Sequence, residues 1–423
     1  MSPDEFSGLD APSLIEGAHG LTLFATGQML IREDWEYVGA VLSGKAPRTR
    51  RSDRLSLTIN HECIHFIQCL TTSQLYKYSL SLVSLCGRIT KESRSGRLTK
   101  RRLRSHKTYY NFLQMRLSAS FRGLSAPDLM EGTAVVEGYF GTFRNATVTD
   151  FQTHLDEMYP GSDHPYRRVI NIVCRRFGLE LGLYLIGPLS FFALNTSQPV
   201  YNFFRFLDIL HKVPESALFG ISANVLGRTV GINPDEWNII PETIRQKGER
   251  HPIYFAYIER LANSYSDDPL LLFEMAARPS RLLSASSAIA SQILPARIEC
   301  NGGRGLWLGI AKGWSTDELL LYVGVATNVG VAERLIREER PYQSCPHSAC
   351  PVHKTALCHA WYMAPKGPEW SACQFPRALE NIFGATADDL MAIRAAALNR
   401  GRYFRLYKSL WMQLGKLTGL FRQ

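Results

Sequence analysis

Apolar residues recur at helical spacing along most of the chain, which predicts a mainly α-helical protein. The longest such stretch runs from Leu55 to Leu85. Leu181 to Leu194 is apolar but shorter than the roughly 20 residues of a membrane span, and it contains Pro188, so a buried core helix is expected. Leu21 to Arg32 alternates around Gly27 and predicts one or two short strands. Further helices are expected at Tyr109–Phe121, Ala126–Phe143, Arg168–Leu185, Val200–Lys212, Pro234–Gln246, Ile253–Asn263, Pro269–Ala277, Leu282–Leu294, Thr316–Glu339, Ala387–Leu398 and Arg402–Leu420.

The composition changes between Pro341 and Pro376, where cysteine, histidine and proline concentrate and helical periodicity is lost. This change predicts three parts. Residues 1–340 form an α-rich main domain, residues 341–376 form a small Cys/His-rich module, and residues 377–423 form a C-terminal helical tail.

The overall composition is that of a globular protein with a sizeable core. Of the 423 residues, 45% are hydrophobic and 20% are charged, which excludes disorder as the main state. The nine cysteines are too few for a disulfide scaffold of this length. The first residues, MSPDEFSGLD, contain no apolar segment of the signal-peptide type, so a cytoplasmic protein with reduced thiols and no membrane partner is expected. Four cysteines in apolar helical stretches are expected to be small core residues: Cys63, Cys69, Cys86 and Cys174.

The net charge of +10 comes from two short segments. Arg88 to Lys107 holds nine Lys or Arg and one acid, a net of +8, and Lys45 to Arg54 holds five and one, a net of +4. The rest of the chain is therefore at −2. Residues 88–107 can contact nucleic acid or an acidic partner. The alternative is a solvated loop, exposed and dispensable for folding, because the run lacks interleaved aromatic residues for stacking on bases.

The most specific motif is His61-Glu62-Cys63-Ile64-His65, an H-E-x-x-H sequence inside the long apolar stretch. On a helix, residues i and i+4 lie one above the other, so both imidazoles can bind one ion. Glu62 is then placed to accept a proton from an attacking water molecule. The alternative is a pair of hydrogen-bonded structural histidines, which leaves a glutamate in an apolar helix without a cation.

A second motif, Glu131-Gly132-Thr133-Ala134, follows at the start of another expected helix. With the H-E-x-x-H sequence it resembles the gluzincin-type zinc metallopeptidases over about residues 55–140. The resemblance implies a zincin-like helical metallohydrolase core with a short β element, and a catalytic Zn²⁺ with Glu131 as third ligand. The tryptophan typical of that second helix is absent, and Val135 stands where several gluzincins have an acid. Glu137 remains open as an alternative third ligand.

Peptide hydrolysis also needs a hydrogen-bond donor for the developing oxyanion. Tyr139 and the turn of residues 163–166, which contains His164, offer candidates for this role and for the catalytic set with Glu62. A structural role is the alternative for each of them. Gln68, three residues after His65, is expected near the ligand face, where it can bind a ligand or the substrate, and a glutamine at the edge of the core is the alternative.

The Cys/His-rich module holds four cysteines spaced C-x4-C-x7-C-x14-C. A loop-rich segment of this size gains the stability it lacks from a structural metal ion. We expect a second, structural Zn²⁺, and an iron–sulfur cluster or unpaired thiols are the alternatives. The expected ligands are Cys345, Cys350, Cys358 and Cys373.

The resulting hypothesis is a zinc metallopeptidase that cleaves a protein or peptide substrate. One alternative is a non-haem iron oxygenase, because two histidines and one carboxylate also suit Fe(II). Another is a catalytically silent binding protein that works through its basic segment.

Overall fold

The computed structural model describes the central part of the chain. The described residues are 20–94, 96–240, 244, 247–248, 250–284, 297–300, 305–307, 325, 329, 332 and 335–336. The expected Cys/His-rich module of residues 341–376, the expected tail of residues 377–423 and the four cysteines of that module lie outside them. So do the helices expected at residues 387–398 and 402–420, and most of the one at 316–339.

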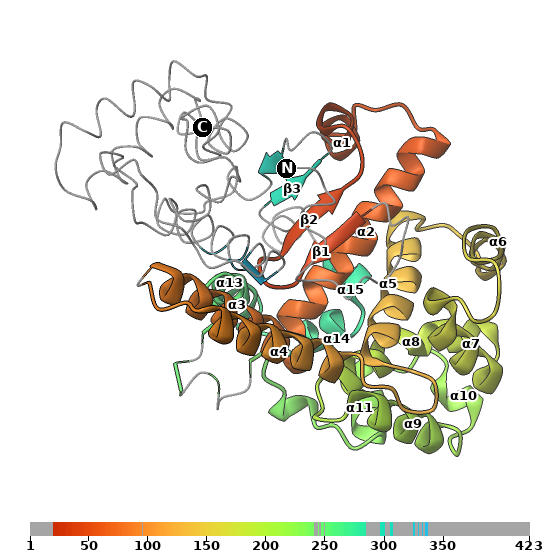
Figure 1. The fold of residues 1–423 in the computed structure, drawn as a ribbon. Helices are drawn as coiled ribbons and strands as arrows, with labels where there is room; N and C mark the ends of the chain where they lie inside the picture. Colours follow the sequence, from red (N-terminus) through yellow and green to blue (C-terminus); the bar gives the residue numbers. More distant parts are fainter. Residues whose placement is uncertain are drawn as a thin grey trace.

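The described chain is mainly helical, as the hydrophobic periodicity predicts (Figure 1). The helices are α1 (Trp35–Leu42), α2 (Arg50–Thr71), α3 (Ser73–Arg94), α4 (Lys100–Leu117), α5 (Ala126–Thr142), α6 (Val148–Met158), α7 (Pro165–Phe177), α8 (Leu179–Leu194), α9 (Pro199–Leu210), α10 (Glu215–Leu218), α11 (Ala223–Thr229), α13 (Tyr254–Ser264), α14 (Pro269–Ala277) and α15 (Pro279–Ser284). A 3₁₀ turn covers Pro234–Glu236.

A small sheet packs on one side of α2 (Figure 1). Its first two strands, β1 (Gly20–Leu23) and β2 (Gln28–Ile31), form the N-terminal hairpin that the alternation predicts. β3 (Arg297–Glu299) pairs parallel to β2, and β4 (Gly305–Trp307) pairs antiparallel to β3; neither strand was predicted. Apolar side chains of β2 and β3 pack with Leu55, Ile59 and Cys63 of α2. The sheet therefore lies along the helix that carries the H-E-x-x-H motif.

The long helical stretch of residues 55–85 is divided into α2 and α3 at Thr72, which has an extended backbone. The side chain of Asn195 makes hydrogen bonds to the backbone groups that the break leaves without helical partners. Its Oδ1 accepts a hydrogen bond from the Ser73 amide at 2.9 Å, and its Nδ2 donates to the carbonyl oxygen of Thr71 at 3.4 Å. The break thus depends on a residue more than 120 positions away in the sequence, which local periodicity cannot reveal.

The apolar stretch of residues 181–194 is a buried core helix, as expected, and forms most of α8. The single helix expected at 168–185 is wrong, because Gly178 has a positive φ of 75° and separates α7 from α8. α14 has the expected bounds, whereas α1, α6, α10 and α11 were not predicted. None of the described helices is both long and apolar enough to cross a membrane.

The basic segment of residues 88–107 is a helical hairpin, so the expectation of a dispensable solvated loop is wrong. It covers the end of α3 and the first half of α4. Ile89, Leu98 and Leu103 are buried in the main core, with side chains at most 5% exposed. The described cations of the segment are exposed on the outward positions, except Lys107, which is half-buried. Replacing the segment by a linker would remove core side chains and destabilise the fold.

Candidate metal centre

Helix α2 holds both histidines of the motif in the middle of a well-capped helix. Thr49 and Ser52 form a capping box at its N-terminus, which fixes the register of the first turn. His61 and His65 are one turn apart, and their ring centroids lie 4.7 Å from each other. The two rings face α5 rather than the sheet, because the apolar side chains of α2 occupy the sheet side.

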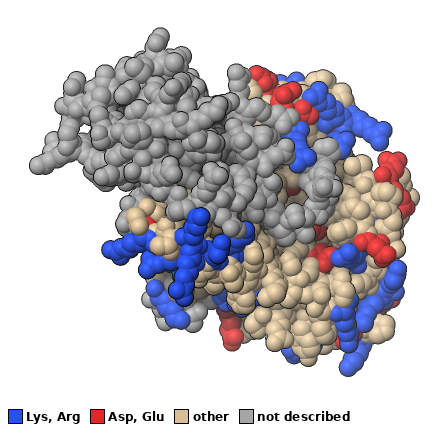
Figure 2. All heavy atoms as spheres, in the orientation of Figure 1, with Lys and Arg blue, Asp and Glu red and all other residues tan. Residues whose placement is uncertain are grey.

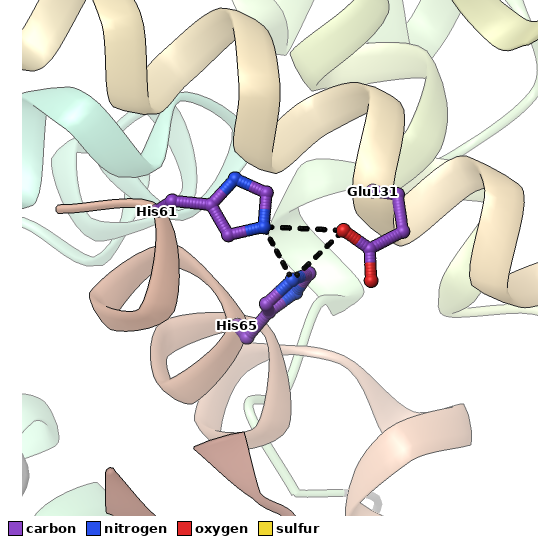
Figure 3. Close-up of side chains that lie close together, drawn as sticks. All are labelled: His61, His65 and Glu131. Carbon is purple, nitrogen blue, oxygen red and sulfur yellow. Dashed lines mark hydrogen bonds and ion pairs between the residues drawn. The ribbon is translucent and has the colours of Figure 1, made fainter. Parts of the chain in front are cut away.

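Helix α5 brings Glu131 to the two histidines (Figure 3). Ser125 and Asp128 form a capping box, and Pro127 lies in the first turn, so α5 begins at a defined residue. The two helices approach closely at Gly138, where an added Cβ would lie 3.2 Å from the Cα of His61. A larger residue there would push α5, and Glu131 with it, away from α2.

Three ligand atoms converge within this interface. His61 Nε2 and His65 Nε2 lie 3.1 Å apart, and they lie 3.1 Å and 3.2 Å from Glu131 Oε2 (Figure 3). The side chains are 12%, 5% and 10% exposed for His61, His65 and Glu131. These three atoms meet the requirements of a metal-binding group, and no cysteine or second carboxylate is needed to complete the triad.

The spacing of these atoms fits a divalent ion. Two tetrahedral ligands at about 2.0–2.1 Å from zinc lie about 3.3 Å from each other. The observed separations of 3.1–3.2 Å are close to this value. Three ligand atoms would leave a tetrahedral ion one open position.

Gln68 fixes the tautomer of His65, which supports a metal ligand at the other nitrogen. Gln68 Nε2 donates to the carbonyl oxygen of Met130 at 3.2 Å, so its Oε1 faces His65 Nδ1 at 3.0 Å. Nδ1 must then carry the proton, and the lone pair of a neutral His65 resides on Nε2. A lone pair aimed at a carboxylate oxygen and at a second imidazole nitrogen is unfavourable unless a cation lies between them.

The pKa shifts within the triad also favour a cation at this position. Burial opposes a charge on His65, yet the carboxylates of Glu131 and Glu62 raise its pKa to about 9. Burial also opposes a charge on Glu131, but His65 and His61 hold its pKa well below the usual range. The interface therefore stabilises one positive charge at this position, as a proton or as a metal ion.

Glu62 lies on the sheet side of the triad and contacts β1. Its Oε2 is 2.8 Å from the hydroxyl of Thr22, which is also 2.9 Å from the backbone carbonyl oxygen of Glu62. Burial raises the pKa of Glu62, while His61 and His65 lower it. Gly20 permits this packing, because an added Cβ would lie 2.8 Å from Cγ and 2.9 Å from Oε1 of Glu62.

Glu137, the alternative third ligand, faces away from the histidines. Its Oε2 accepts hydrogen bonds from the backbone amide of Ser280, at 3.2 Å, and from the Ser280 hydroxyl. Its Oε1 lies beside Gly187 of α8. Six residues along a helix is about 240°, so Glu137 and Glu131 cannot share a face. The structure assembles the histidines with Glu131.

The structure does not bring Tyr139 to the triad. Its ring packs against Phe143, Phe151 and His154, with centroid distances of 5.0, 5.0 and 4.9 Å. The side chain is buried in the core formed by α5 to α9. It therefore has the contacts of a core residue.

The turn of residues 163–166 does reach the triad, through Tyr166 rather than His164. His164 caps α7, because its Nδ1 accepts a hydrogen bond from the Tyr166 amide at 3.3 Å. The ring of Tyr166 lies 5.6 Å from that of His61 and 4.8 Å from that of Tyr159. The sequence singled out His164 from this turn rather than Tyr166, and Tyr159 was not predicted as a site residue.

Both phenols keep their protons near neutral pH. Burial, and then the charge of Glu131, raises the pKa of Tyr159 to about 12, and the same two causes raise that of Tyr166. Each hydroxyl can therefore act as a hydrogen-bond donor. The only sequence signal was the aromatic content of the turn that follows α6.

The cysteines of the described helices are core residues, as expected: Cys63, Cys69 and Cys86 are buried and Cys174 is half-buried. Burial raises the pKa of the Cys63 thiol, which keeps it protonated in the apolar cluster between α2 and the sheet.

Comparison with known proteins gives no relative for this chain: no protein-family model, no curated protein and no solved structure matches it. Its function must therefore be argued from the site alone.

Proposed function

We propose that the protein is a metal-dependent hydrolase, and specifically a zinc metallopeptidase. The observation that carries the proposal is the convergence of His61 Nε2, His65 Nε2 and Glu131 Oε2 at 3.1–3.2 Å, with a buried glutamate beside them. The same arrangement supports Glu131, rather than Glu137, as the third ligand.

The residues present supply each function that hydrolysis requires. A divalent ion held by the triad would polarise a scissile carbonyl and supply a nucleophilic water at neutral pH. Oε2 of Glu62 accepts a hydrogen bond from the Thr22 hydroxyl, which orients the carboxylate, and this carboxylate would accept the proton of the attacking water. The new C–O bond forms at the carbonyl carbon. As the C–N bond breaks, Glu62 returns the proton to the leaving amine. The products are a carboxylic acid and an amine, which ionise to a carboxylate and an ammonium group near neutral pH.

Tyr166 replaces Tyr139 and His164 as the oxyanion donor of this proposal. Its ring stands beside His61, and its hydroxyl remains protonated. Tyr159 packs against it and restricts its rotamer. A donor in this position would stabilise the negative charge that develops on the substrate oxygen.

The first test is metal analysis of the full-length protein purified without added metal. Because the cysteine module is expected to hold a second ion, wild type is compared with His61→Ala and His65→Ala. The proposal expects each variant to lose about one equivalent of zinc. Full retention would refute the triad, and iron in place of zinc would favour the oxygenase hypothesis.

The second test separates chemistry from metal binding. Glu62→Gln keeps the shape of the side chain but cannot accept a proton, so the variant should keep its metal. It should lose about 10²-fold or more in cleavage rate on a peptide library analysed by mass spectrometry. Glu259→Gln, an exposed position on α13, is the matched control and should cleave normally. Undiminished cleavage by Glu62→Gln would refute the mechanism.

A further inference from the structure

The hairpin of α3 and α4 gathers positive charge on its outer face, away from the metal centre. Figure 2 shows the Lys and Arg side chains clustered over these two helices. The stretch from Arg88 to Leu117 contains ten Lys or Arg and one acid, Glu92. Eight of the described cations are exposed: Arg88, Lys91, Arg97, Lys100, Arg101, Arg102, Arg104 and Arg116.

The single acid of the hairpin does not neutralise this face. Glu92 Oε2 lies 3.1 Å from His106 Nε2 and 3.8 Å from the Arg102 guanidinium. These contacts tie α3 to α4 and hold the hairpin in one arrangement. The outer cations are thereby presented by two packed helices with a buried inner face, a fixed surface rather than a flexible tail.

In the tertiary structure, exposed aromatic rings lie next to these cations. The run of residues 88–107 itself contains no Phe, Tyr or Trp. Tyr109 and Phe112 are 39% and 47% exposed, and their rings stack with centroids 6.4 Å apart at 24°. The guanidinium of Arg88 comes from α3 and lies 5.5 Å from the Tyr109 centroid. Cations and exposed aromatic faces are therefore neighbours on this surface.

We propose that this outer face binds single-stranded nucleic acid. Arginine and lysine would contact the phosphates, and unstacked bases would stack on Phe112 and Tyr109. A duplex hides its base faces and could use only the cations. A lipid surface fits less well, because Thr108 and Asn111 are exposed between the aromatic residues and would be desolvated by insertion.

The test uses the full-length protein and fluorescently labelled pyrimidine oligonucleotides, one DNA and one RNA, with fluorescence anisotropy over a range of KCl concentrations. Phosphate and base chemistry are common to both strands, and the tighter binder identifies the natural class. With about four phosphate contacts, log K should fall against log[KCl] with a slope of about −3. Absence of binding at low salt, or a slope near zero, would overturn the proposal.

Two variants separate the phosphate and base contributions. Arg101→Gln/Arg104→Gln should reduce the magnitude of the slope by about 1.4, which is about 0.7 for each contact. Phe112→Ala should leave the slope unchanged but weaken single-strand binding by about 10-fold or more, with little effect on a duplex of the same length. Both sites are exposed, so the melting temperature should not change.

Matched controls carry the same changes on other surfaces. Arg175→Gln/Arg205→Gln removes two exposed arginines of α7 and α9, and Phe219→Ala removes a phenyl ring that is 53% exposed. Neither control should affect binding. Equal losses in controls and hairpin variants would overturn the proposal. It would also fail if phosphatidylserine vesicles bound more tightly than the oligonucleotides and competed with them.

Discussion

Helix α5 carries two buried glutamates, six residues apart, whose surroundings differ in kind. Glu131 is 8% exposed and Glu137 is 6% exposed, so burial does not distinguish them. Glu137 is satisfied by the amide and hydroxyl donors of Ser280. Glu131 instead faces two imidazoles whose nitrogens also face each other, an arrangement that is favourable only with a positive charge among the three atoms. A buried carboxylate therefore indicates a metal site only when its partners are themselves ligands.

The same substitution at both positions should give the largest contrast. Glu131→Gln removes an anionic ligand. Loss of a hydrogen bond that supports a metal ligand weakens metal binding by up to roughly 100-fold, so loss of the ligand itself should weaken it by more than that. Glu137→Gln should leave metal affinity unchanged. Competition with a chromophoric chelator measures both affinities. Metal loss from Glu137→Gln alone would reverse the assignment of the third ligand.

Removing the hydrogen bond that orients His65 should have a smaller effect on metal affinity. Gln68→Leu breaks the hydrogen bond to His65 Nδ1, so the ring loses its fixed tautomer and orientation. We expect metal affinity to fall by about 10- to 100-fold. Gln152→Leu, on α6, is the control in the same competition assay. An affinity equal to that of wild type would show that Gln68 does not orient the ligand.

Glu137 should contribute to stability rather than to chemistry. Glu137→Gln replaces charge-assisted hydrogen bonds to Ser280 with neutral ones, which should lower the free energy of unfolding by about 1 kcal/mol. Urea denaturation of variant and wild type measures the difference. A stable variant with impaired peptide cleavage would instead place Glu137 in the reaction.

A third buried group, His251, makes the stability of the fold depend on pH. Burial lowers its pKa to about 3, and its Nδ1 accepts hydrogen bonds from the amides of Ile253 and Tyr254. The unfolded chain binds a proton near pH 6.5 and the folded chain does not, so stability falls as pH decreases from 6.5 toward 3. The expected loss is about 1 kcal/mol over the first unit below pH 6.5.

Urea denaturation at several pH values measures this slope, and His251→Gln should reduce it. Other histidines titrate in both proteins, so the difference between their slopes isolates His251. Identical slopes would mean that His251 is protonated in the folded protein.

Local sequence was a good guide wherever the relevant interactions were local. The i, i+4 spacing of His61 and His65 places both rings on one face of any helix that contains them. Ser125 and Asp128 define the start of α5 through a capping box within four residues. The predicted boundaries failed at Thr72, where the deciding side chain is that of Asn195.

The predictions for the site likewise succeeded where local interactions decide and failed where long-range packing decides. The sequence identified the turn before α7 but not Tyr166, because its distance from His61 depends on how α7 packs on α5. Tyr139 was misassigned because its position on α5 leaves its direction open, and the direction is set by Phe143, Phe151 and His154.

The sequence by itself determined the helical class, the N-terminal hairpin and the histidine pair, because periodicity, turns and one-turn spacing act over a few residues. Only the tertiary structure decided between Glu131 and Glu137, and only it converted the basic run of residues 88–107 into a rigid cationic face. Both outcomes depend on which faces of α5 and of the α3–α4 hairpin turn inward. That choice is made by apolar burial summed over helices distant in sequence, and no single segment encodes it.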